Sequence, residues 1–436
     1  MVHSPEKRKT EAAFPPRPAW RGINADTLMK SFLTLRSVDE VLGMIREFPV
    51  LPSESVPLSE ALGRYLSSDI YAACDVPGFD RSAVDGYAVR ARDVFGAQES
   101  SPALLECVGD CPMGQAPRAV LHEGQTARIL TGGMLPEGAD AVVMVEYSRP
   151  VSDTMVEIIR SQAPGDHVLM HDDDAAQGKL VLARGCRLRP QEIGLLAALG
   201  EGQVACCRKP RVVILSTGDE VVAVETRPAP GQVRDINSHT LRALCQNEGA
   251  CVVQSCLVPD DKERLAEHVR QGLEQADVVL LSGGSSAGMR DFTVEIFQSM
   301  PQSELLVHGV SLSPGKPFIL ARSNTTCLMG LPGHVSGALI CARVFVVALL
   351  RRLQAAGETI EAQVQARLTR PIASAQGRRD YIRVRLLRQG QSWLAEPITG
   401  PSGLISGLVQ ADALVICPEN SEGLYAGSEV TAFLLY

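Results

Sequence analysis

Several short polar loops of this sequence combine glycines with charged side chains in patterns that could bind an anion or a metal ion. The stretch LSGGSSAGMRD at 281–291 follows an apolar run typical of a buried strand, and charge returns only at Arg290 and Asp291. Bare backbone N–H groups at a strand end that leads into a helix can bind a phosphate or another oxyanion. The same glycines also suit a tight turn, so this loop alone leaves both interpretations open.

Further loops of this kind occur along the chain. They read PGFDRSAVDGYAV (77–89), ILTGGMLPEGADAVV (129–143), STGDE (216–220), SLSPGKPFIL (311–320) and MGLPGHVSGALI (329–340). In the last loop, Pro332 and Gly333 lead into a predicted helix whose N–H groups and dipole favour an anion. Lys316 follows Gly315 in a rigid loop that could aim an ammonium group at an oxyanion. His334 suits a helix cap as well as a catalytic base, and acidic residues in glycine turns usually cap the turn.

The elements that would position these loops follow from the hydrophobic pattern. From residue 210, the strand-like runs RVVIL, CVVQSCLV and DVVLL alternate with helical segments such as KERLAEHVRQGLEQA. This alternation predicts a parallel sheet with helices on both faces. Ligands of such sheets bind beyond the carboxyl ends of the strands. STGDE, PDD and SGGSSAGMRD all fall at those ends, so we expect them on one rim.

The rest of the chain is patterned differently. Helical periodicity is predicted over 25–72, as in Val38-x-x-Val41-Leu42 and Leu58–Leu62, and short β runs follow over 73–162. Residues 163–200 hold a polar Asp-rich turn, a strand and an apolar helix. After a long helix near 333–353 the pattern becomes β again, which predicts a small all-β domain. Residues 1–24 have the composition of a disordered leader.

Composition bounds the class of protein. A chain of 436 residues is expected to form two to four domains. A net charge of −8 and an aromatic content of 4% argue against nucleic-acid binding. The apolar segment 335–350 contains Arg343 and is short for a bilayer, so we expect no membrane span and no signal peptide. Twelve cysteines without framework spacing indicate reduced thiols and a cytoplasmic location.

Taken together, the loops resemble one family. The matching stretches are DVPGFDRSAVDGYAV, ILTGGMLPEGADAVVMVE, ILSTGDE, DINS, LSGGSSAGMRD, SPGKPF and GLPGHVSGAL. Their order and approximate spacing are similar to those of the molybdopterin molybdenumtransferase family, which includes the bacterial molybdenum-insertion enzyme and the E domain of gephyrin. The resemblance covers roughly residues 28–436. Ordered motifs in three different domains are far more specific than any single glycine loop.

The resemblance implies a multidomain α/β plus β fold and an elongated homodimer. The implied reaction is the insertion of molybdate into adenylylated molybdopterin with release of AMP, supported by Mg²⁺. The active cleft would lie between the α/β domain of one subunit and the β domain of the other. Other partners that it suggests are a molybdopterin adenylyltransferase and apo-molybdoenzymes. The expected domains are a leader (1–24), a helical linking and dimerisation domain (25–72 with 163–200), an inserted β domain (73–162), a parallel-sheet α/β molybdopterin-binding domain (201–356) and a C-terminal β-barrel (357–436).

The resemblance also assigns roles to residues. Asp85, Thr131, Glu220 and Lys316 fall on catalytic positions, and Asp291 with Glu220 on the metal ligands. Carboxylates can reach an anionic substrate only through a cation, which fits this metal role. Expected substrate-binding residues are Ser282, Gly283, Gly284, Ser285, Arg290, Gly315, Pro332, Gly333, His334, Arg378 and Ser402.

The chain departs from the family pattern at points that reduce positive charge. Ser313 stands where a lysine is common before PGK, His334 replaces an asparagine, and the linking segment reads LMHDDD instead of carrying arginines. We expect Arg290 to compensate for Ser313. The alternatives to molybdate insertion are a tungstate-dedicated paralogue and a non-catalytic homologue that binds pterin or acts as a scaffold. An unrelated nucleotide pyrophosphatase would not account for PGFDRSAVDGYAV or the C-terminal β domain.

Overall fold

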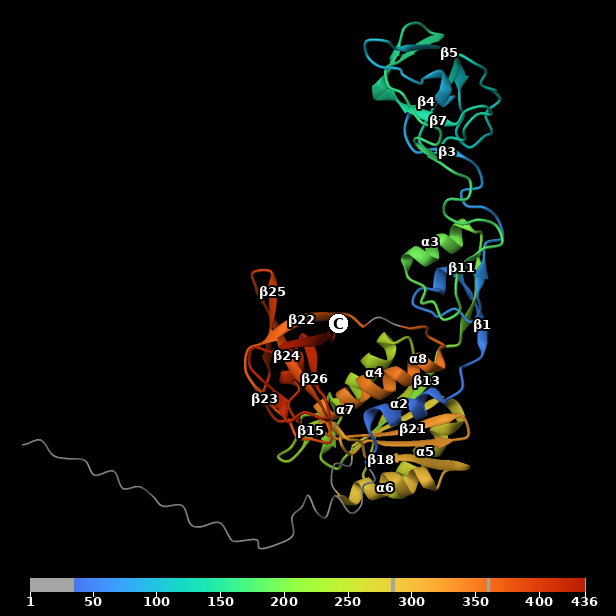
Figure 1. Cartoon of the computed structure of the whole chain (residues 1–436). Coiled ribbons are helices and arrows are strands. Elements are labelled where there is room, and N and C mark those ends of the chain that lie inside the picture. Colours follow the sequence, from blue (N-terminus) through green and yellow to red (C-terminus); the bar gives the residue numbers. More distant parts are fainter. Residues whose placement is uncertain (1–34, 284–286, 359–360, 436) are drawn as a thin grey trace, which may run out of the picture.

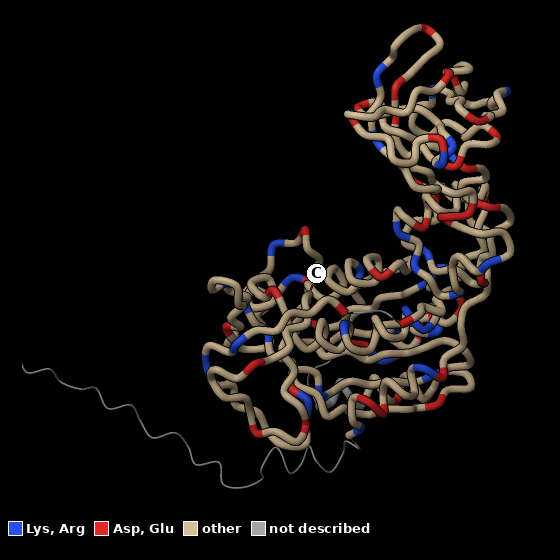
Figure 2. Tube along the Cα trace, turned by 45° about the horizontal axis from the view of Figure 1, so that its top comes forward, with Lys and Arg blue, Asp and Glu red and all other residues tan. Residues whose placement is uncertain are grey.

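The computed structural model describes residues 35–283, 287–358 and 361–435, and for residues 287–291 it describes the backbone alone. The chain is elongated (Figure 1). An α/β unit and a β-barrel lie side by side, and a narrow linking unit joins the α/β unit to a separate β unit at the far end. Acidic and basic residues are interspersed along the whole trace (Figure 2), so strong local charge must come from a few particular side chains.

The α/β unit is built on a six-stranded sheet in the order β16-β13-β17-β21-β20-β18. The first four strands are parallel, as predicted, and β20 runs antiparallel to both of its neighbours, β21 and β18. The strands are β13 (Arg211–Thr217), β16 (Cys251–Val258), β17 (Val278–Ser282), β18 (Ser303–His308), β20 (Ile319–Ser323) and β21 (Thr326–Leu331). The helices are α4 (Asn237–Asn247), α5 (Lys262–Gln275), α6 (Ala287–Gln298), α7 (Val335–Cys341) and α8 (Val347–Leu353), with a π-helical turn between the last two.

Both faces of this sheet are buried, which accounts for the unbroken apolar runs of its strands. In β13, Val212 and Ile214 join one core cluster with α4, α7 and α8, while Val213 and Leu215 join the other with α5 and α6. No helix in the described part of the chain has both the length and the apolar character needed to cross a membrane.

Helix α2 (Val38–Arg46) also belongs to this core. Ser37 caps it in a capping box with Glu40, and Val38, Val41 and Ile45 are buried against α8 and its neighbours. Residues 25–34 of the predicted helical segment 25–72 lie outside the described residues, and after α2 the helical prediction is wrong as far as residue 72. Residues Leu58–Glu60 form a single 3₁₀ turn, because Pro57 and Gly63 bound a stretch too short for a stable helix.

The linking unit therefore combines short strand pairs with one helix. Strand β1 (Ser53–Pro57) pairs with β12 (Gln203–Cys207), β2 (Ile70–Tyr71) pairs with β11 (Leu180–Leu182), and α3 (Pro190–Ala198) covers them. The β unit beyond it holds a six-stranded sheet in the order β7-β4-β6-β5-β9-β8. Its strands are β4 (Gly86–Val89), β5 (Ala103–Asp110), β6 (Gln125–Ile129), β7 (Ala141–Met144), β8 (Ser148–Pro150) and β9 (Met155–Ile158); β3 (Arg81–Ser82) and β10 (Val168–Leu169) pair at its base.

The C-terminal unit is a closed barrel. Its strands follow one another in the order β24-β25-β22-β28-β26, and β26 pairs back with β24. They are β22 (Gln363–Leu368), β24 (Arg379–Gln389), β25 (Ser392–Pro397), β26 (Ala413–Cys417) and β28 (Glu429–Leu434), with the short pair β23 (Ile372–Ala373) and β27 (Gly423–Leu424) and helix α9 (Ser406–Val409). Strand β19 (Leu312–Ser313), which comes from the α/β unit, adds to β24. Part of the α/β chain is thus hydrogen-bonded into the barrel sheet.

Candidate active site

Three neighbouring parallel strands of the α/β unit end at one edge of the sheet. Strand β13 ends at Thr217, β17 at Ser282 and β21 at Leu331. The loops that follow are 218–220, a loop beginning at Gly283, and 332–334. Strand β16 ends beside them at Val258, so STGDE, PDD and the start of SGGSSAGMRD share this edge, as predicted from the sequence. The loop 332–334 also lies at this edge and was not part of that prediction.

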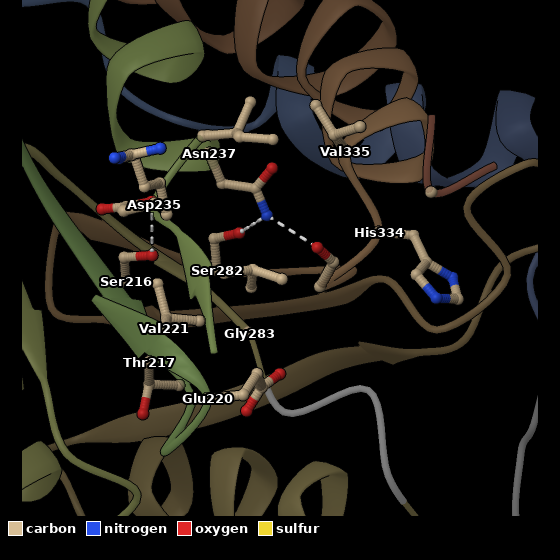
Figure 3. Close-up of a pocket in the computed structure, with 15 residues that line it drawn as sticks. Ser216, Thr217, Glu220, Val221, Asp235, Asn237, Ser282, Gly283, His334 and Val335 are labelled. Atoms are coloured by element: carbon tan, nitrogen blue, oxygen red, sulfur yellow. Dashed lines mark hydrogen bonds between the residues drawn. The ribbon is translucent and has the colours of Figure 1, made fainter. Parts of the chain in front are cut away.

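A first cavity of about 290 Å³ lies at these strand ends (Figure 3). Asn237, at the start of α4, organises its wall. Its Nδ2 donates to Ser282 Oγ and to the carbonyl oxygen of Gly333, both at 2.8 Å. Asn237 is 8% exposed, and its Oδ1 has no hydrogen-bond partner within the described part of the chain. One amide therefore ties the end of β17 to the loop after β21.

Asp235 performs the same task for β13. Ser216 Oγ lies 3.0 Å from Asp235 Oδ1, and the backbone N–H of Ser238 donates to the same oxygen at 3.1 Å. Asp235 and Asn237 belong to the DINS stretch, and the sequence alone predicted no role for either residue. The available signal was that stretch itself, polar residues placed immediately before a helix.

Gly283 is required by the close approach of two strand ends. Its φ is +140°, and a Cβ at this position would lie 2.1 Å from the carbonyl oxygen of Thr217. No other residue could occupy the position without moving the backbone. The glycine that the sequence singled out as part of an anion loop is thus also a packing necessity.

Glu220 lines the first cavity beside Gly283 (Figure 3). No hydrogen bond or ion pair holds its carboxylate within residues 35–283, 287–358 and 361–435. An unpaired carboxylate is a suitable ligand for Mg²⁺, which takes one or two carboxylates together with water and substrate phosphates. The described residues contain no cluster of three His, Cys, Asp or Glu side chains that could hold a metal by themselves.

A second cavity of about 760 Å³ adjoins the first and shares Gly333 and His334 with it. Its walls come from the loops 311–317 and 332–334 of the α/β unit, and from residues 375–378 and Ser402 of the barrel unit. The predicted residues Gly315, Lys316, Pro332, Arg378 and Ser402 all line it. Residues from two structural units and from positions almost 100 apart thus meet in one space.

The charged residues that line the second cavity are all basic. Its lining includes Lys316 and Arg378 but no aspartate or glutamate. Arg378 is partly neutralised from behind, since its Nε lies 2.9 Å from Asp380 Oδ1 and its Nη2 donates to Oδ2 at 3.1 Å. Two cationic side chains that face a space without carboxylates favour an anionic ligand.

Gly315 allows the loop that carries Lys316 to pack tightly. Its φ is +140°, and a Cβ there would lie 2.3 Å from Leu312 Cδ2 and 2.5 Å from Cys341 Sγ. The backbone N–H of Val310 donates to the Lys316 carbonyl at 3.0 Å, which closes the loop. The lysine is therefore held on a constrained backbone, as its flanking residues predicted.

Asp85 directly precedes β4 and Thr131 follows β6, so both lie in the β unit. Figure 1 shows this unit separated by the linking unit from the α/β unit that carries the cavities. The Thr131 backbone N–H and hydroxyl both donate to Asp85 Oδ1 at 2.7 Å. These hydrogen bonds, the backbone one first, hold the pKa of the Asp85 carboxyl below its usual value. The two residues make a site with each other but do not reach Glu220 or Lys316 within one chain.

Four predicted site residues have no described side chain. Gly284 and Ser285 fall outside the described residues. Arg290 and Asp291 belong to the backbone of α6, whose first residues have no described side chains. The predicted metal role of Asp291 and the compensating role of Arg290 remain predictions.

Family models match almost all of the described chain. Residues 36–200 match the MoeA N-terminal region (domains I and II), residues 213–352 a probable molybdopterin binding domain, and residues 365–435 the MoeA C-terminal region (domain IV). The two cavities thus lie in and beside a unit of the molybdopterin-binding class. The chain belongs to the MoeA family.

Individual relatives match this chain over most of their length. The molybdopterin molybdenumtransferase of Nostoc sp. is 33% identical over 389 residues, which cover 88% of this chain and 89% of the relative. That of Haemophilus influenzae is 31% identical over 392 residues and covers 89% and 95%. The crystal structure of the molybdopterin biosynthesis moeA protein from Pyrococcus horikoshii OT3 superposes with a TM-score of 0.79 at 31% identity, covering 92% of this chain and all of that one.

Proposed function

We propose that this protein is a molybdopterin molybdenumtransferase that inserts molybdate into adenylylated molybdopterin and releases AMP. The observation that supports this most is the pair of adjoining cavities. One is walled by strand-end loops and faces Glu220, and the other carries Lys316 and Arg378 without an acidic residue. A substrate with a pyrophosphate at one end and an oxyanion acceptor at the other needs two such neighbouring spaces.

In this proposal the first cavity holds the substrate's phosphate-bearing part. Strand-end N–H groups are suited to phosphate oxygens. The second cavity holds molybdate, with the Lys316 ammonium and the Arg378 guanidinium directed at its oxygens. Gly333 and His334, which border both spaces, would then lie near the point where the dithiolene meets the molybdate.

Mg²⁺ is part of the proposal, held by Glu220 and Asp291. When bound, it would neutralise pyrophosphate charge next to the Glu220 carboxylate. We expect Asp291→Asn, which keeps the side-chain shape and removes its charge, to weaken the Mg²⁺ dependence of AMP release sharply while the fold persists. An unchanged Mg²⁺ titration would assign Asp291 to a structural role.

We further propose a homodimer in which the partner's β unit completes the cleft. The pair Asp85 and Thr131 belongs to the β unit, which lies far from the α/β unit of its own chain (Figure 1), and a second copy could bring the pair to the cavities. Light scattering at micromolar concentration is expected to give twice the mass of the chain. A stable monomer would remove this model.

The reaction is proposed to occur in the cytoplasm, because all twelve cysteines are unpaired, as expected of a reducing compartment. A molybdopterin adenylyltransferase would supply the adenylylated substrate, and apo-molybdoenzymes would receive the product. The deciding experiment incubates the purified full chain with adenylylated molybdopterin, Mg²⁺ and either molybdate or tungstate, and measures AMP release and metal incorporation. Turnover with tungstate alone would favour a tungsten-dedicated enzyme, and no turnover with either would favour a binding or scaffolding role.

A further inference from the structure

His334 occupies a position that no other titratable side chain of the site shares. It lines both cavities, at the junction between the end of β21 and the start of α7. We propose that His334 makes oxyanion binding in the second cavity depend on pH. In its imidazolium form it adds a third positive charge and a charged N–H donor; in its neutral form it offers the oxyanion no more than an uncharged N–H beside Lys316 and Arg378. This inference rests on the oxyanion role proposed above for that cavity.

The imidazole lies beside the barrel loop. Ser402 Oγ lies 3.4 Å from His334 Nδ1, and a Cβ added at Gly403 would lie 3.7 Å from His334 Cδ2. The backbone N–H of Ser336 donates to the Ser402 carbonyl at 3.0 Å, which links the two loops. In this arrangement the ring contacts the barrel loop through Nδ1.

The other ring nitrogen remains available. Nε2 of His334 has no hydrogen-bond partner within the part of the chain that the structure describes, and the side chain is exposed. Figure 3 shows the ring directed away from Asn237, out of the hydrogen-bonded wall of the first cavity. A protonated Nε2–H could thus donate to a ligand oxygen while Nδ1 keeps its contact with Ser402.

The charges that face His334 favour a role in anion binding. On the second-cavity side these are Lys316 and Arg378, and Asp380 lies behind Arg378. On the first-cavity side, Arg234 is engaged by the carbonyls of Val224 and Thr226, and Asp235 by Ser216. Glu220 is the remaining carboxylate there. An oxyanion in the second cavity would consequently meet no lining carboxylate, and its strongest variable contact would be the imidazole.

The size of the effect follows from the kind of bond. A hydrogen bond to a charged group exceeds a neutral one by an amount that corresponds to roughly a tenfold change in affinity. Imidazole is the side chain whose charge changes between about pH 5 and 8. The Kd for an oxyanion is therefore expected to rise about tenfold from pH 6 to pH 8, as the proton is lost.

The test measures oxyanion binding directly, without turnover. Isothermal titration calorimetry of the full chain is performed with molybdate and, separately, with sulfate, which stays a dianion throughout this range. His334→Asn removes the titrating charge and keeps a side chain that is favoured at a helix N-cap, so it is expected to fold. His334→Lys keeps a positive charge at every pH tested. His239→Asn, an exposed position on α4 that lines neither cavity, is the matched control.

Wild type and His239→Asn are expected to show the tenfold change in Kd. His334→Asn should bind at the weak, high-pH level at both pH values, and His334→Lys should bind more tightly than His334→Asn at pH 8 with little pH dependence. A pH profile that survives in His334→Asn, or a flat profile in wild type with measurable binding, would overturn the role of His334 and leave the oxyanion cavity standing. Absence of oxyanion binding by wild type at any pH would overturn both.

Discussion

Replacing Asn237 by alanine tests whether one amide holds the strand ends of the first cavity together. The change removes donors to Ser282 Oγ and to the Gly333 carbonyl, both 2.8 Å away. The Ser282 hydroxyl loses the donor to its oxygen but keeps its own O–H and can rotate, whereas the Gly333 carbonyl oxygen can only accept. A buried polar group left without its partner costs about 1–3 kcal/mol, and one lost bond that is partly recovered costs about 1 kcal/mol. Better helix propensity of alanine returns about 0.5 kcal/mol.

The expected net loss is thus about 1.5–3.5 kcal/mol in the free energy of unfolding of the α/β unit. For a unit of this size, that corresponds to a fall of roughly 3–14 °C in the temperature of its calorimetric transition. Asn247→Ala, at the exposed end of the same helix, is the control; a change of ~0.3 kcal/mol there would shift the transition by only about 1 °C. Because the two loops would also separate, binding of an adenylylated ligand should weaken. A variant within about 0.5 kcal/mol of wild type, with unchanged ligand affinity, would refute the reasoning.

Three further outcomes follow from contacts described above. Thr131→Val removes the hydroxyl donor to Asp85, so the pKa of that carboxyl should rise toward its usual value in an NMR titration. A carboxyl whose pKa is lowered by folding stabilises the folded state at a pH above its usual pKa, and this contribution is lost as the pH falls through the lowered pKa. The variant should therefore lose less stability on acidification than the wild type. Gly315→Ala should lower the unfolding temperature and weaken oxyanion binding in calorimetry, because its Cβ would overlap Leu312 and Cys341. Ser313→Lys should tighten molybdate binding at pH 8 by about 1.5–3 kcal/mol, and equal affinity would show that residue 313 does not face the anion.

The parts of the fold that follow from local pattern could be predicted. The unbroken apolar run of β13 needs a sheet covered on both faces, and the structure has one. The carboxyl-end rim followed from the same alternation. Residues 58–62 were misjudged because one apolar spacing of four is compatible with a turn as well as with a helix, and the flanking Pro57 and Gly63 decide between them.

The site was harder to predict from the sequence because the residues that form it are far apart along the chain. Asn237 is 45 residues from Ser282 and 96 from Gly333, so no local signal marks the amide as a clamp. The placement of α2 against the α/β core depends in the same way on helices some 300 residues later. The positions of the glycines indicated where the backbone needs unusual geometry. Only the folded structure shows which atoms lie so close to Gly283 and Gly315 that a side chain would not fit.

The insertion of β19 into the barrel sheet has a thermodynamic consequence. Leu312 and Ser313 pair with Arg379 and Asp380, so the loop that carries Lys316 and the barrel share one set of backbone hydrogen bonds. Any ligand that contacts both walls of the second cavity binds the docked arrangement alone, and at a concentration one hundred times its Kd it would add about 2.7 kcal/mol to the free energy of docking. The ligand would then stabilise the docked arrangement: an occupied chain should melt as one cooperative body, while an empty one would let its barrel separate from the α/β unit first.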